Sequence, residues 1–167
     1  DIKGTLSFKD AFNVVRLWCA DGLKNVRFSG GEPTLYNGLE ELVSYCKLKG
    51  VERIAVSTNG SADWSKYKSL LQAGVNDFTI SLDSCCSSVG DKMAGGINGS
   101  CQRVVETIKR LSALTYTTVG CVINGDNLFS CVDTVLFADS LGVSDIRVIP
   151  SAQFNKLLSV MNKIPAN

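Results

Sequence analysis

The stretch VRFSGGEPTLYNGLEEL, from Val26 to Leu42, decides the fold. Its first four residues have the apolar, β-prone pattern of a strand, and they run directly into Gly30, Gly31, Glu32 and Pro33 before a helix begins. Glycine lets a ligand approach the backbone closely, glutamate offers an acceptor-only carboxylate suited to an ammonium group, and proline stiffens the turn. The stretch predicts a ligand site at the end of a strand. A plain strand-to-helix turn is the alternative.

Short β-prone runs alternate with helical patterns along the rest of the chain. The strands are expected at Val26 to Ser29, Arg53 to Ser57, Asp77 to Leu82, Thr117 to Ile123 and Asp145 to Ile149. The helices are expected at Ser7 to Asp21, Leu39 to Lys49, Trp64 to Ala73, Cys101 to Leu114, Leu128 to Leu141 and Asn155 to Lys163. This alternation predicts an α/β fold with a parallel sheet and right-handed crossovers.

In such a fold the functional loops lie at the carboxyl ends of the strands. Polar or glycine residues follow each predicted strand at that end. They are Gly30, Gly31 and Glu32, then Ser57, Thr58 and Asn59, then Ser81 and Asp83, then Ile123, Asn124 and Gly125, and finally Pro150 and Ser151. We therefore expect these residues to meet at one rim.

Length and composition bound the function. The 167 residues predict a single domain over 1–167, and the net charge of +1 lacks the basic excess that nucleic-acid binding requires. No apolar run reaches the roughly 18 residues of a membrane-spanning helix. Seven cysteines with irregular spacing favour a reducing compartment, the cytoplasm, over a disulfide framework. Most of them are interpreted as small core hydrophobes, whereas Cys85 and Cys86 lie in a Ser-rich stretch interpreted as a loop.

The motifs together resemble the radical S-adenosylmethionine (SAM) superfamily. The segments IAVSTNG at 54–60, FTISLDS at 78–84 and DKMAGG at 91–96 are most similar to the branch that contains the molybdenum-cofactor enzyme and the peptide maturases. The likeness extends from about Leu6 to Ser151. It implies a partial (β/α)6 TIM-like barrel in which the Gly-Gly-Glu-Pro motif follows the second strand of the family.

The resemblance implies a role for each rim residue. Gly30, Gly31 and Glu32, in the turn closed by Pro33, would hold the methionyl ammonium of SAM, and Ser57 and Thr58 would lie beside its methionyl and sulfonium part. Ser81 and Asp83 would face the ribose hydroxyls, with helix capping or turn formation as the alternative. Asn59 is expected to cap the turn that follows it.

The adenine-packing motif of the family matches less fully. Ile123, Asn124 and Gly125 fit its core, but Cys121 stands in place of its first glycine and Leu128 in place of its glutamate.

Two cations are candidates for substrate binding. Lys92, next to Asp91 in a predicted glycine-rich loop, is placed to reach the cofactor carboxylate or the substrate, and a solvated charge pair is the alternative. Arg147 on the last strand is expected either to point into the barrel toward an anionic substrate or outward to a helix.

The family holds a 4Fe-4S cluster with three cysteines in a CxxxCxxC loop after its first strand. This spacing does not occur in the chain, so we expect the first strand and the cluster loop to lie upstream of Asp1 and residues 1–167 to be inactive alone. The strand at Val26 to Ser29 would then expose an unpaired edge, which favours dimerisation or aggregation.

The implied activity is reductive cleavage of SAM to methionine and a 5'-deoxyadenosyl radical, which abstracts hydrogen from a small-molecule or peptide substrate. A flavodoxin-like or ferredoxin-like electron donor is the expected partner. One alternative is a cluster-less regulatory domain that binds SAM or a nucleotide. A barrel lyase with Lys92 as a Schiff-base amine is a further alternative.

Overall fold

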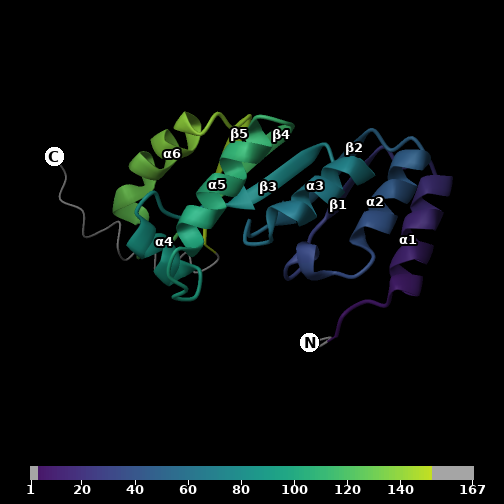
Figure 1. The fold of residues 1–167 in the computed structure, drawn as a ribbon, viewed down its shortest axis with the longest axis horizontal. Coiled ribbons are helices and arrows are strands. Elements are labelled where there is room, and N and C mark those ends of the chain that lie inside the picture. Colours follow the sequence, from purple (N-terminus) through teal and green to yellow (C-terminus); the bar gives the residue numbers. More distant parts are fainter. Residues whose placement is uncertain (1–3, 152–167) are drawn as a thin grey trace. The chain divides into compact units, whose positions relative to one another are not determined.

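A computed structural model describes residues 4–151, so the helix predicted over 155–163 lies outside the described residues. The structure is α/β, with helices and strands alternating along the chain (Figure 1). Its strand order is β1-β2-β3-β4-β5, and the pairs β1–β2 and β4–β5 are parallel. The described residues divide into two compact units. The first contains residues 4–58 and 62–78, and the second contains residues 59–61 and 79–151.

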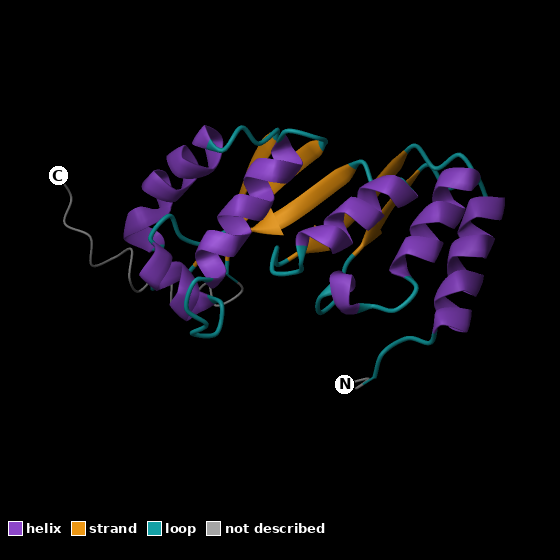
Figure 2. Cartoon of the chain, in the orientation of Figure 1, coloured by secondary structure: helices purple, strands orange, loops and turns teal. Residues whose placement is uncertain are grey.

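The first unit contains two parallel strands, the first two residues of a third strand, three α-helices and one 3-10 helix. Its elements are α1 (Phe8–Ala20), β1 (Asn25–Phe28), the 3-10 helix η1 (Pro33–Leu35), α2 (Leu39–Leu48), β2 (Arg53–Thr58) and α3 (Trp64–Ala73). Strand β1 pairs with β2 so that Val26 lies opposite Ile54. Helix α2 packs between α1 and α3, and the three helices run side by side in Figure 2.

Local chemistry fixes where these helices begin. The Ser7 hydroxyl accepts a hydrogen bond from the Asp10 N–H at 3.2 Å, which caps α1. Gly38 precedes α2 with φ of +94°, and a Cβ built there would lie 2.4 Å from the ring of Phe8. The positive φ therefore favours glycine at this position, and the Phe8 ring of α1 lies close against it.

The core of the first unit lies between α2, α3 and β2. Its fully buried side chains come from one stripe of each helix and from one face of the strand, as period 3.6 and period 2 require. They include Val43 and Cys46 of α2, Ile54 and Val56 of β2, and Tyr67 and Leu70 of α3.

The second unit contains the last three residues of β3, the strands β4 and β5, three more α-helices and a second 3-10 helix. Strand β3 (Asp77–Ser81) is followed by α4 (Ser87–Met93), α5 (Ser100–Ser112), β4 (Tyr116–Ile123), η2 (Leu128–Ser130), α6 (Cys131–Ser140) and β5 (Asp145–Pro150). Strands β4 and β5 are parallel, with Gly120 opposite Arg147. Helices α5 and α6 both contact β4, and the core includes Ile80, Ile108, Leu111, Val119 and Cys121.

The predicted loop around Asp91 and Lys92 is wrong, because these residues belong to α4. This helix buries none of its residues, so it leaves no apolar periodicity in the sequence. Asp91 pairs with the amino end of α5 and not with Lys92. Its carboxylate accepts from the Gly99 N–H at 2.8 Å, the Cys101 N–H at 2.8 Å and the Ser100 hydroxyl at 3.0 Å. These bonds lower the pKa of Asp91, the one from Cys101 most.

The other predicted elements of residues 4–151 are confirmed with small shifts at their ends, except that η2 interrupts the start of the last helix. Three of the cysteines interpreted as core hydrophobes, Cys46, Cys101 and Cys121, are buried, whereas Cys19 and Cys131 are half-buried. Within the described residues, no helix combines the length and the apolar character that crossing a membrane requires.

Candidate functional site

The Glu32 carboxylate is held at the turn that follows β1. Its Oε1 accepts hydrogen bonds from the Thr34 N–H at 3.1 Å, the Thr34 hydroxyl at 2.7 Å and the Thr58 hydroxyl at 2.7 Å. Glu32 thereby caps η1, and it also joins the ends of two neighbouring strands. The sequence predicted the carboxylate, but it did not predict that Thr34 and Thr58 would hold it.

A buried phenol supports Thr58 from the other side. The Tyr67 hydroxyl lies 3.4 Å from the Thr58 hydroxyl and accepts from the Ala62 N–H at 3.3 Å. Because Thr58 directs its hydroxyl proton to Glu32, Tyr67 is the donor in the contact between the two hydroxyls. Burial raises the pKa of Tyr67 and keeps the phenol protonated. The result is a fixed chain of hydroxyls ending on one carboxylate oxygen.

Ser57 faces the opposite side of β2 from Thr58, as strand alternation requires. Its hydroxyl accepts a hydrogen bond from Nη1 of Arg27 at 3.1 Å. Arg27 is thus held on the face of the strands that carries Ser57.

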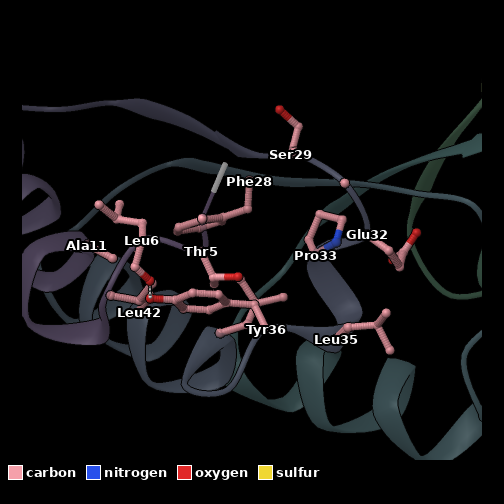
Figure 3. Close-up of a pocket in the computed structure, with 14 residues that line it drawn as sticks. Thr5, Leu6, Ala11, Phe28, Ser29, Glu32, Pro33, Leu35, Tyr36 and Leu42 are labelled. Atoms are coloured by element: carbon pink, nitrogen blue, oxygen red, sulfur yellow. Dashed lines mark hydrogen bonds between the residues drawn. The ribbon is translucent and has the colours of Figure 1, made fainter. Parts of the chain in front are cut away.

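The turn also borders a cavity of about 510 Å³ in the first unit. Its lining residues include Gly30 and Gly31. Figure 3 shows Glu32 at one end of the lining and Leu6 and Ala11 at the other. Tyr36 stands among them, and its hydroxyl donates to the Leu6 carbonyl at 3.1 Å. The cavity therefore brings the predicted glycine turn beside the segment that precedes α1.

The two glycines leave their backbone open. Gly30 has φ of +148°, and a Cβ built at Gly30 or Gly31 would meet no described atom within 4 Å. Pro33, by contrast, is buried as the first residue of η1. An open backbone next to a fixed carboxylate is an arrangement that suits an ammonium ligand.

In the second unit, Ser81 and Asp83 line a separate cavity of about 180 Å³. Its other polar lining residues are Asn59 and Ser84, and its apolar wall includes Met93, Cys101 and Val104. Ser81 is exposed and Asp83 half-buried. The predicted Asn59 turn is also present, since the Asn59 Oδ1 accepts from the Ser61 N–H at 2.9 Å.

The Asp83 carboxylate is anchored to the next strand. Its Oδ1 accepts from the Val122 N–H at 2.7 Å. Burial raises the pKa of Asp83 above its ordinary value, and the hydrogen bond from Val122 opposes part of that rise.

The segment after β4 is organised by a residue that we did not select from the sequence, Asn127. Its Oδ1 accepts from the Asn124 N–H at 2.8 Å, and its Nδ2 donates to the carbonyls of Asp83 and Val122. Gly125 is exposed. Ile123 packs into a small core with Cys121, Leu128 and Cys131. The pattern INGDN marks a turn in the sequence, but the partners of Asn127 become visible only in the fold.

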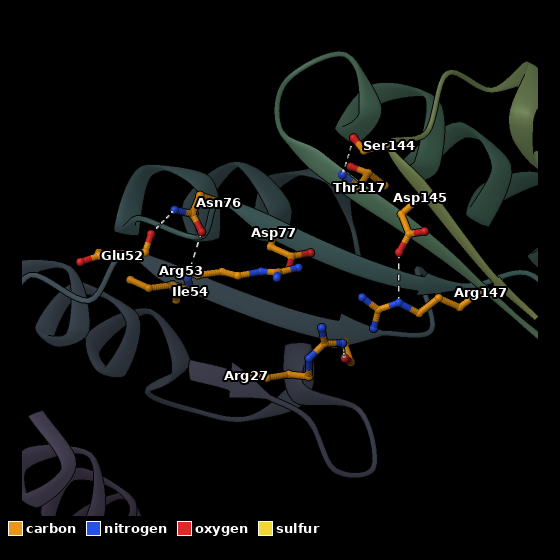
Figure 4. Close-up of polar contacts among 11 residues, drawn as sticks. Arg27, Glu52, Arg53, Ile54, Asn76, Asp77, Thr117, Ser144, Asp145 and Arg147 are labelled. Carbon is orange, nitrogen blue, oxygen red and sulfur yellow. Dashed lines mark hydrogen bonds and ion pairs between the residues drawn. The ribbon is translucent and has the colours of Figure 1, made fainter. Parts of the chain in front are cut away.

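The two candidate substrate cations each have an acidic neighbour. Lys92 lies 3.6 Å from Asp126, and its side chain is 75% exposed. Arg147 donates from Nε to Asp145 Oδ2 at 3.1 Å on β5 (Figure 4). The alternative for Lys92, a charge pair with Asp91, is wrong in its partner, because Lys92 lies beside Asp126.

Side chains that could bind a metal do not gather in the described ranges. Within residues 4–151, no three Cys, His, Asp or Glu side chains lie close enough together to hold a metal ion. Cys86 is exposed, and hydrogen bonds, chiefly with the Ser88 hydroxyl, lower its pKa. Burial raises the pKa of Cys46 to about 12 and that of Cys121 to about 11.

The parallel sheet and the polar groups at its strand ends define the class of α/β proteins that bind ligands at the carboxyl ends of their strands. A sequence model described as the radical SAM superfamily matches residues 3–138. The chain belongs to this superfamily, whose members are enzymes that use SAM and a 4Fe-4S cluster.

Individual relatives agree with this assignment. The Aquifex aeolicus (strain VF5) protein named GTP 3',8-cyclase is 29% identical over 157 residues, which cover 87% of this chain and 48% of the relative. The chain thus spans about half the length of this curated relative.

Solved structures show the same fold. Streptococcus suis SuiB bound to SAM superposes with a TM-score of 0.72 at 17% identity, over 93% of this chain and 37% of SuiB. SuiB bound to the precursor peptide SuiA gives 0.74 at 17% identity, over 92% and 34%.

Proposed function

We propose that the protein containing this chain is a radical SAM enzyme that acts on a small-molecule or peptide substrate. The single observation that carries the proposal is the fixed Glu32 carboxylate beside the open backbone of Gly30 and Gly31. This arrangement fits the methionyl ammonium of SAM, because a positioned carboxylate and backbone groups bind a cation without further rearrangement. The turn made by Pro33 and Thr34 keeps the carboxylate in place.

The remaining residues are proposed to bind the other parts of SAM. Ser57 contacts the methionyl and sulfonium part, while Thr58 acts through Glu32, to which its hydroxyl is bonded. Ser81 and Asp83 receive the ribose hydroxyls in the cavity of the second unit. Ile123, Asn124 and Gly125 supply the surface for adenine. Lys92 and Arg147 remain the proposed contacts of an anionic substrate.

Bound SAM and its cluster supply reductive cleavage to methionine and a 5'-deoxyadenosyl radical that abstracts hydrogen. The part of the protein is to bind, orient and exclude water. The cluster ligands are proposed to lie upstream of Asp1, and a flavodoxin-like or ferredoxin-like protein is the proposed electron donor. Without the upstream segment, β1 would present an edge for self-association. This is supported by the position of β1 at one end of the strand order and by the exposure of Asn25 and Arg27.

Anaerobic reconstitution of the full-length protein tests the enzymatic proposal. With iron, sulfide, SAM and a chemical reductant, it is expected to form a brown cluster and release 5'-deoxyadenosine, measured by chromatography. A polypeptide of residues 1–167 is expected to release none, because the cluster ligands are proposed to lie outside it, and no three Cys, His, Asp or Glu side chains gather within residues 4–151. The second candidate is a cluster-less SAM-binding domain. That candidate predicts SAM binding by the full-length protein without a cluster or cleavage.

The pH dependence of SAM binding tests the role of Asp83. The ionised carboxylate is the better acceptor for ribose hydroxyls, and the pKa of Asp83 is raised by burial. Full affinity is therefore expected above this raised pKa, and affinity should fall as the pH is lowered through it, starting at a higher pH than for an ordinary aspartate. Calorimetric titrations of the protein and of Asp83→Asn over a pH series measure this. A ratio of the two affinities that stays constant with pH would refute the role of Asp83.

A further inference from the structure

The side chain of Asn127 completes the ladder between β3 and β4 where the backbone pairing ends. The Leu82 N–H still donates to the Gly120 carbonyl at 2.9 Å. One step further, at Val122, both backbone groups are bonded to side chains. The Val122 N–H donates to the Asp83 carboxylate at 2.7 Å, and the Val122 carbonyl accepts from Asn127 Nδ2 at 2.8 Å.

The second bond of the Asn127 amide holds Asp83 itself. Nδ2 also donates to the Asp83 carbonyl at 2.7 Å. Asp83 is thus fixed at two points, through its backbone by Asn127 and through its carboxylate by Val122. Within the described ranges, the Asp83 side chain makes no hydrogen bond other than the one from Val122. Its second oxygen is therefore available to a ligand in the cavity that Asp83 lines.

The side-chain amide of Asn127 uses both of its donor hydrogens and its acceptor oxygen in hydrogen bonds, and the residue is almost fully buried. The residue is 1% exposed, both Nδ2 hydrogens are donated, and Oδ1 accepts from the Asn124 N–H at 2.8 Å. Removing such a group leaves three backbone partners unsatisfied, and each buried unsatisfied group carries a penalty. This amide therefore ties the Asp83 segment to the Asn124 segment.

We propose that Asn127 is a positioning residue that sets the Asp83 carboxylate for the ribose hydroxyls of the cofactor and places the neighbouring Asn124 segment for adenine. This inference rests on the proposed function. Asn127 touches backbone atoms at the ends of two strands, so it acts through Asp83 and Asn124 and not by its own contact with the ligand.

The test asks whether Asn127 positions Asp83 or only stabilises the fold. It compares how strongly the protein prefers SAM over analogues that lack one ribose hydroxyl. Calorimetry on the full-length protein gives the dissociation constants of SAM and of its 2'-deoxy and 3'-deoxy analogues. We expect the original protein to bind at least one analogue about tenfold or more weakly than SAM, as loss of a hydrogen bond to a charged group implies. In Asn127→Ala the ratio should fall close to one, as in Asp83→Asn.

Two further variants make the result specific. Asn127→Asp keeps the side-chain volume and the oxygen that accepts from Asn124, but it loses the Nδ2 donors. It should therefore also lose the discrimination between SAM and its deoxy analogues. This variant takes the place of Asn127→Ala if Asn127→Ala does not fold. Ser130→Ala is the matched control in the same turn, because the Ser130 hydroxyl donates to the backbone carbonyl of Asn127 and does not contact its side-chain amide. It should keep the original ratio.

The possible outcomes test the role of Asn127 separately from SAM binding itself. A folded Asn127 variant that discriminates as well as the original protein overturns the positioning role, whereas the proposed function stands. An original protein that binds SAM without discriminating the analogues overturns both the role of Asp83 and that of Asn127. Failure of the original protein to bind SAM at all removes the proposed function and this inference with it.

Discussion

Replacing Glu32 with glutamine is expected to weaken SAM binding to the full-length protein by about 1 to 3 kcal/mol, or roughly 5- to 150-fold. The substitution changes charge more than shape. The glutamine carbonyl can take the place of Oε1 and keep the bonds from Thr34 and Thr58, so the turn should remain intact. The charge that attracts the ammonium is lost. Calorimetry under anaerobic conditions measures the change in affinity.

A matched control removes the same charge from a position outside the turn. Glu41 is exposed on α2, and Glu41→Gln should bind SAM as the original protein does. The thermal midpoints of both variants should stay close to that of the original protein, because neither substitution removes a buried group. Unaltered affinity in Glu32→Gln would take Glu32 out of the binding site.

The elements near Glu32 show what a sequence reveals. The strand before the turn and the helix after it can be predicted from apolar periodicity. The paired glycines predict an unusual backbone conformation in the turn, and Gly30 indeed has a positive φ. The partners of Glu32 do not follow in this way. Thr58 lies 26 positions away along the chain, and it reaches the carboxylate only because β1 and β2 pair in one particular register. Register depends on the packing of the whole sheet face, so the hydrogen bond between Thr58 and Glu32 could not be predicted from the sequence.

Helix α4 was missed for a related reason. Gly90 stands inside it, which lowers helix propensity, but a Cβ there would lie 2.7 Å from the Cys101 Sγ. The glycine therefore allows α4 to approach α5 closely. The cap of α5 is equally non-local, since Gly99 at its amino end has no side chain and Asp91 supplies the oxygen atoms. Neither contact belongs to a sequence-local motif, so both appear only once the helices are placed.

The second large effect concerns stability, at the amino-terminal ends of β2 and β3. Arg53→Met is expected to lower the free energy of unfolding by about 1 to 3 kcal/mol, because it removes the half-exposed cation that pairs with the buried Asp77 carboxylate and leaves that carboxylate without its donor. The side chain of Asp77 is 2% exposed, and its Oδ2 accepts from Arg53 Nε at 2.7 Å and Nη2 at 2.5 Å (Figure 4). Its Oδ1 is buried without a partner in the described residues.

Denaturant unfolding of the full-length protein measures this loss as a lower midpoint at unchanged slope. Lys24→Met is the matched control, since Lys24 pairs with Glu52 at 64% and 69% side-chain exposure, and exposed pairs contribute about 0 to 1 kcal/mol. The double variant Arg53→Met with Asp77→Asn should recover part of the loss, because it removes the unpaired charge together with its partner.

Measuring SAM binding in the same variant distinguishes the two ends of these strands. Arg53 and Asp77 are the first residues of β2 and β3, whereas Glu32 lies in the turn that follows β1 and Thr58 is the last residue of β2. In parallel α/β folds the amino-terminal ends mainly serve stability and the carboxyl-terminal ends carry the ligand site. Folded Arg53→Met should therefore bind SAM as tightly as the original protein. A marked loss of affinity in this variant would contradict the division between a stabilising end and a binding end.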